Sequence, residues 1–132
     1  MRIKAYVESM DSSFKWVMDA LQLVPQPAGM LEELLVMKRG SKPFSFPERG
    51  LPAEDVLSEG VARRVKESNA RHTQRHASWL TREDLIKKSA ELLITPEANA
   101  LKVRSALIGL IQSMGTLTEN PRHQRLVFWF HI

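Results

Sequence analysis

The sequence predicts a mainly α-helical α+β fold: one compact domain over residues 1–132, with about five helices and a small C-terminal β-hairpin. Apolar side chains recur at helical spacing in several segments, which indicates amphipathic helices. Strong N-cap residues precede two of these segments. Residues that favour extended structure are concentrated near the C-terminus, on both sides of a turn. A hydrophobic fraction of 43% in 132 residues is sufficient for a single core.

The N-terminal part, residues 1–50, is expected to contain two helices and a proline-rich loop. Residues 2–7 alternate only weakly and predict at most a short strand. A helix with Ser9 or Asp11 as its N-cap should follow, because its apolar residues form one stripe: Phe14, Val17, Met18, Leu21 and Val24. A second, short helix is expected over residues 30–37.

The loop over residues 39–51 contains Phe44 and Phe46 among its prolines and glycines. Either the two rings pin the loop to the core, or they form a tip that binds a partner. Pinning is favoured, because an exposed pair of phenylalanines lowers solubility. The second alternative makes Phe44 and Phe46 candidate interface residues.

Residues 51–79 are expected to form a basic connecting helix. Pro52 suits the first helical turn, because it needs no backbone N–H there. The helix would continue to about Arg75. Since residues 66–76 contain no large apolar residue, that part of the helix is expected to be exposed, frayed or bound to a partner.

Two further helices have clear start signals. Thr81 is the expected N-cap of a helix with acidic residues in its first turn, and this helix should run to about Leu93. Thr95 is the expected N-cap of the next helix, over residues 96–114. Extended segments around an Asn-Pro turn then predict a hairpin over residues 116–130.

The formal net charge of +4 is distributed unevenly along the chain. Residues 1–60 hold 7 Lys or Arg and 9 Asp or Glu, a net charge of −2, whereas residues 61–132 hold 12 and 6, a net charge of +6. The excess is densest between Arg63 and Lys88. Such asymmetry indicates either a polyanionic partner or a solvated basic face.

The order of elements from residue 80 onward is helix, short turn, longer helix and hairpin. The segments Leu80–Leu85 and Val103–Leu110, followed by Gly115–Leu117, resemble the winged helix-turn-helix superfamily. This resemblance covers residues 80–130. It implies that residues 80–132 are a winged-helix-like part whose longer helix enters the major groove of DNA.

The candidate DNA contacts are mostly cations that would bind phosphates, and the last three would lie at the tip or in the second strand of the wing hairpin. They are Arg71, Arg75, Arg82, Lys87, Lys88, Lys102, Arg104, Ser105, Arg122, His123 and Arg125. Helical projection of residues 96–114 leaves only a narrow polar wedge. Backbone contacts are therefore expected to dominate over base reading.

The last predicted strand, residues 127–130, is apolar without alternation. A strand of this kind is covered on both faces, so it is either an inner strand or a strand buried between subunits. In the second case Phe128 or Trp129 would anchor a homodimer. Leu101 and Ile108, on an apolar flank of the longer helix, are further candidate interface residues.

The sequence predicts no catalytic, metal or cofactor site. It has no cysteine, no glycine-rich phosphate loop and no nucleophile motif. His72 and His76 would share a helix face, but the surrounding positive charge disfavours a metal ion. No secretory signal or membrane span is recognised, so a cytoplasmic protein without a membrane partner is expected.

The sequence therefore predicts a non-enzymatic DNA-binding protein, a small transcriptional regulator of bacterial or phage type whose partner is double-stranded DNA. The alternative is a protein-binding adaptor or inhibitor module that docks on a larger protein or complex.

Overall fold

A computed structural model describes residues 2–23, 49–53, 55–96, 100–114 and 120–131. Over these residues the chain is an α+β fold with three α-helices and a four-stranded antiparallel sheet. The prediction of about five helices with a C-terminal β-hairpin is therefore wrong. The elements in chain order are β1 (Arg2–Met10), β2 (Trp16–Leu23), α2 (Glu59–Arg71), β3 (Gln74–Thr81), α3 (Arg82–Leu93), α4 (Ala100–Ser113), the 3-10 turn η1 (Pro121–His123) and β4 (Gln124–His131).

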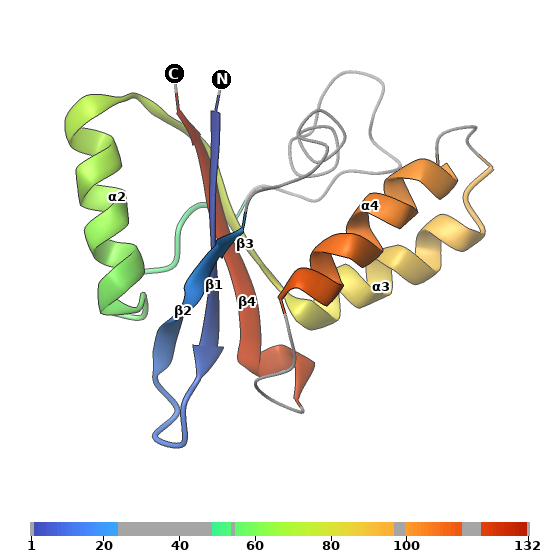
Figure 1. Ribbon diagram of the computed structural model, residues 1–132, viewed down its shortest axis with the longest axis horizontal. Coiled ribbons are helices and arrows are strands. Elements are labelled where there is room, and N and C mark those ends of the chain that lie inside the picture. The colour runs from blue at the N-terminus through green and yellow to red at the C-terminus, as the bar shows by residue number, and fades with distance from the viewer. Residues whose placement is uncertain (1, 24–48, 54, 97–99, 115–119, 132) are drawn as a thin grey trace.

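The strand order of the sheet is β2-β1-β4-β3, and every neighbouring pair is antiparallel. The two central strands come from opposite ends of the sequence, and their register places Tyr6 opposite Val127. Helix α2 covers one face of the sheet, whereas α3 and α4 lie together on the other side (Figure 1).

Each face of the sheet has its own apolar core, because successive residues of a strand point to opposite faces. On β4, Phe128 lies in the core beneath α3 and α4, and Trp129 lies in the core beneath α2. Both side chains are fully buried. Of the two alternatives for this apolar segment, the structure shows the inner strand.

The predicted N-terminal helix is wrong, because residues 2–23 form a β-hairpin. Asp11, the expected N-cap, closes the hairpin turn instead: its Oδ1 accepts hydrogen bonds from the backbone N–H groups of Ser13 (2.8 Å) and Lys15 (3.0 Å). An aspartate satisfies the first amides of a helix and the amides of a turn with the same chemistry. Local chemistry at Asp11 therefore does not distinguish a helix from a hairpin; the pairing of β1 with β4 favours the extended conformation of residues 2–10.

The basic connecting helix predicted over residues 51–79 is shorter than expected. Helix α2 begins after Ser58, whose Oγ accepts a hydrogen bond from the N–H of Val61 (3.3 Å), and it ends at Arg71. The following residues form the edge strand β3, which the helical pattern concealed. A bulge interrupts its pairing, and there His76 has a φ of 52°.

Two local predictions for the C-terminal half are confirmed. Thr81 caps α3 in a reciprocal capping box with Asp84, and α3 ends at Leu93. The core stripe predicted on the longer helix is buried: Val103, Leu107, Leu110 and Met114. The Thr95 cap is not shown: its hydroxyl donates to the C=O of Glu91 (2.8 Å), and residues 97–99 lie outside the described residues.

The C-terminal hairpin over residues 116–130 is wrong for a geometric reason. A strand has two hydrogen-bonding edges, and β4 uses one for β1 and the other for β3. Within the described residues β4 is therefore an inner strand of the sheet, and residues 115–119 lie outside the described residues. The wing of the expected winged-helix-like part is thus replaced by the central strand of a sheet.

The cap of α3 yields a pH-dependent prediction. Burial raises the pKa of Asp84, but hydrogen bonds from Arg49 and Thr81 outweigh burial, and the pKa is lowered overall. The stabilisation is therefore present above the ordinary pKa of aspartate and is lost as the pH falls through the lowered value. Asp84→Asn should cost about 1 kcal/mol near neutral pH. Urea unfolding should show this difference shrinking in acid; a pH-independent difference would contradict the ionic contribution.

Candidate functional site

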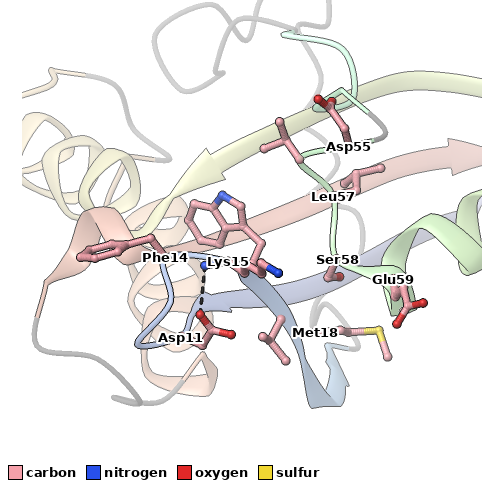
Figure 2. Close-up of a pocket in the computed structure, with 12 residues that line it drawn as sticks. Asp11, Phe14, Lys15, Met18, Asp55, Leu57, Ser58 and Glu59 are labelled. Atoms are coloured by element: carbon pink, nitrogen blue, oxygen red, sulfur yellow. Dashed lines mark hydrogen bonds between the residues drawn. The ribbon is translucent and has the colours of Figure 1, made fainter.

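A groove of about 790 Å³ lies on the α2 face of the sheet, between the β1–β2 turn, the start of β2 and the segment that leads into α2 (Figure 2). This volume is in the range of ordinary binding sites. The lining residues are Asp11, Phe14, Lys15, Trp16, Val17, Met18, Asp55, Val56, Leu57, Ser58, Glu59 and Gly60.

Phe14 occupies the hairpin end of the groove, and Glu59 lies at the opposite end (Figure 2). The Phe14 side chain is 74% exposed, and its backbone has a φ of 58°, which L-residues rarely adopt. The Asp11 hydrogen bonds hold this turn, and the Phe14 ring meets His123 edge-on at 6.3 Å. The fold thus holds a large aromatic ring in solvent on a strained turn, a combination typical of binding sites.

A buried ion pair lies beneath the groove. Arg125 Nε donates to Glu8 Oε1 at 2.7 Å, and the two side chains are 5% and 0% exposed. The Arg125 guanidinium also lies 4.0 Å from the centre of the Trp16 ring, which lines the groove. Burial lowers the pKa of Arg125, and the adjacent Glu8 carboxylate partly offsets that effect.

The same ion pair holds the far wall of the groove. The second oxygen of Glu8, Oε2, accepts a hydrogen bond from the backbone N–H of Ser58 (2.7 Å). Arg125 Nη2 donates to the backbone carbonyl of Val56 (3.2 Å). The central strands β1 and β4 therefore fix the position of the wall through two side chains.

At the α2 end of the groove, Gly60 permits a close approach between the helix and β2. A Cβ atom at Gly60 would lie 2.7 Å from Cε and 3.1 Å from Cβ of Met18. The Cε atom of Met18 is the flexible end of its side chain and can move, but its Cβ atom is fixed to the backbone of β2. A larger residue would therefore require the Met18 side chain to move and β2 or α2 to shift slightly.

The rim of the groove is acidic although the chain is basic. Among the described lining residues, Asp11, Asp55 and Glu59 outnumber the one cation, Lys15, which gives these residues a formal charge of −2 within a chain of +4. Exposed apolar surface lies among these charges, since Val17 and Val56 are 47% and 44% exposed. This arrangement suits a ligand with both apolar and cationic groups.

Four of the predicted DNA contacts form ion pairs within the chain, and a fifth donates to a backbone carbonyl. Glu83 pairs with Arg122 (2.5 Å) and Lys87 (3.1 Å), and hydrogen bonds from these two cations lower its pKa. Lys88 pairs with Glu91 (3.2 Å). Arg104 Nε donates to the backbone carbonyl of Ser89 (3.0 Å), and Arg125 is buried with Glu8.

These predicted contacts also do not form one surface. Arg71 is at the end of α2, on one face of the sheet, together with the exposed Arg63, Arg64 and Lys66 of that helix. Nine others are on the opposite side of the sheet or at its edge: Arg82, Lys87 and Lys88 on α3, Lys102, Arg104 and Ser105 on α4, Arg122 and His123 on η1, and Arg75 in β3, whose side chain is not described (Figure 1). Arg125, in the inner strand β4, is buried beneath the groove.

The predicted interface residues differ in where the structure places them. Phe44 and Phe46 lie outside the described residues. Phe128 and Trp129 are buried inside the protomer and offer no surface to a partner. On α4, Leu101 is 67% exposed, and Ile108 is half-buried.

Sequence reasoning missed the groove. Phe14, Val17 and Met18 were assigned to the apolar stripe of a helix, and Asp11 to its cap. Glu8 and Arg125 are 117 residues apart in the sequence, so no local pattern joins them. The one available signal was an exposed phenylalanine within a polar turn, Asp-Ser-Ser-Phe-Lys, which is compatible with a hairpin.

Within the described ranges, no group of three or more His, Cys, Asp or Glu side chains is placed to hold a metal ion. None of the described helices has the length and apolarity needed to cross a membrane. No protein-family model, curated protein or solved structure matches the chain.

Proposed function

We propose that the protein is a protein-binding module that holds a segment of a partner carrying apolar side chains next to lysine or arginine. The observation that supports this function is the apolar groove with an acidic rim, in a chain whose net charge has the opposite sign. Each apolar side chain buried there would contribute about 1.5–3 kcal/mol. The rim would accelerate association and select cationic partners.

The groove disfavours DNA as its ligand, because its carboxylates would repel phosphates. The cations elsewhere are divided between two sides of the sheet, and three of the predicted DNA contacts there, Lys87, Lys88 and Arg122, have carboxylate partners. A mobility-shift titration with random duplex DNA at two salt concentrations tests the competing function. We expect weak binding at low salt that disappears at physiological salt; tight binding with a steep salt dependence would favour DNA.

A matched pair of variants tests the groove. Val56 and Ile86 are exposed to nearly the same extent, 44% and 43%, but Val56 lines the groove and Ile86 lies on α3, across the sheet. A displayed library of random peptides, selected on the wild-type protein, should enrich apolar residues next to Lys or Arg. Val56→Lys should weaken the selected peptides about tenfold or more, by removing apolar contact and repelling their cations.

The control variant Ile86→Lys should leave the affinity of these peptides unchanged. Enrichment of acidic peptides, or equal affinity for the two variants, would refute a binding role for the groove. Raising the salt concentration should slow association with the wild-type protein more than it speeds dissociation.

A further inference from the structure

Strand β2 lies at the edge of the sheet, and within the described part of the chain its only neighbour is β1. An edge strand presents backbone N–H and C=O groups that can pair with another chain. The first residues of β2, Trp16 to Met18, also line the groove. The edge and the groove are therefore one continuous surface.

The register of the hairpin shows which backbone groups point outward. Asp11 N–H donates to the Lys15 carbonyl at 2.8 Å, so these two residues are a hydrogen-bonded pair. In an antiparallel pair such positions alternate with non-hydrogen-bonded positions. Val17, opposite Ser9, then points its N–H and C=O groups toward β1, whereas those of Trp16 and Met18 point to the open edge.

We infer that the partner segment binds in extended form, as an additional strand on the β2 edge at Trp16 and Met18. This inference rests on the proposed function and deepens it. Main-chain hydrogen bonds would supply affinity, and alternate side chains of the added strand would enter the groove. The side chains of Trp16 and Met18 line the groove next to the edge and form its floor. Asp55 and Glu59, two of the three carboxylates of the acidic rim, lie across the groove from them.

Charge complementarity selects the occupant. Because residues i and i+2 of a strand point to the same face, a segment whose groove-facing positions carry an apolar residue flanked by lysine or arginine places the apolar group on the floor and the cations at the rim. A second copy of this chain, paired edge to edge through β2, would instead bring two acidic rims together, and like charges in close apposition are unfavourable. The favoured occupant is therefore a cationic strand of another protein.

Amide hydrogen exchange of the protein tests the inference, with a peptide of about seven residues as the probe, in which lysine and valine alternate along one face of the strand and serine occupies the other face. At saturation, exchange at the Trp16 and Met18 amides should slow about tenfold or more, whereas the Val17 amide, already bonded to β1, should not change. A fully N-methylated version of the peptide should lose binding about tenfold or more, since it retains the side chains but cannot donate.

The outcomes separate the two proposals. If the peptide binds in a manner that depends on Val56 but the two amides exchange as before, the segment is held by side chains alone; the inference is then wrong and the proposed function stands. If binding does not respond to Val56→Lys, both are wrong. Protection of the two amides in the free protein that increases with protein concentration would assign the edge to a second copy and overturn the inference.

Discussion

Replacing Glu8 with glutamine is expected to destabilise the fold by about 3–5 kcal/mol, because it leaves the buried Arg125 guanidinium without a counter-charge. Glu8 is fully buried, and the substitution preserves its shape while removing its charge. Urea unfolding near neutral pH would give the difference as a change in midpoint at constant slope. Since Glu8 also holds Ser58, the variant should in addition bind groove ligands more weakly.

The control for this experiment is Glu67→Gln. Glu67 pairs with Arg64 at 3.6 Å, and both side chains are at least half exposed, so little change in stability is expected. The double variant Glu8→Gln with Arg125→Met should recover part of the loss, because no unpaired charge remains buried. Equal stability of the Glu8 and Glu67 variants would show that the buried pair does not support the fold.

Trp129→Ala should have an effect of similar size, about 3–5 kcal/mol. Trp129 is fully buried under α2, it stacks on Tyr6 with ring centres 5.5 Å apart, and its Nε1 donates to Ser68 Oγ at 3.0 Å. The alanine would leave a large cavity between α2 and the sheet. Thermal or urea unfolding gives the stability change.

Two further measurements separate the contributions of Trp129. Ser68→Ala removes only the acceptor of the indole N–H and should cost about 1–3 kcal/mol, by leaving a buried donor unpaired. Burial raises the pKa of Tyr6, so in Trp129→Ala that pKa should fall toward its ordinary value as water enters. A Tyr6 pKa that does not change would indicate that the core closes over the cavity.

An element could be predicted when the interactions that form it join residues close together in the sequence, and not when they join distant residues. The capping box of α3 is contained within four successive residues, and Thr81 and Asp84 were sufficient to place that helix. The β1–β2 hairpin was missed because the hydrogen bonds of Asp11 fit a turn as well as a helix start. Strand β3 was missed because it is a half-exposed edge strand next to a basic helix, with no continuous apolar run.

The candidate site was less predictable than the fold. Its floor depends on Glu8 and Arg125, which meet only when the first and last strands pair. Its wall, residues 55–58, has no regular structure of its own and is placed by those two side chains. By contrast, the charge asymmetry was evident in the sequence, but charge alone did not show that cations such as Arg122 have carboxylate partners.

The pairing of β1 with β4 has a consequence for biosynthesis. Residues 2–10 are translated before the other described elements, yet their central neighbour, residues 124–131, is translated after them. Until then β1 and β2 form an isolated hairpin, which is marginally stable in water. The sheet therefore forms completely only after β4 has been translated, and such long-range pairing predicts slow folding relative to helical domains of similar length.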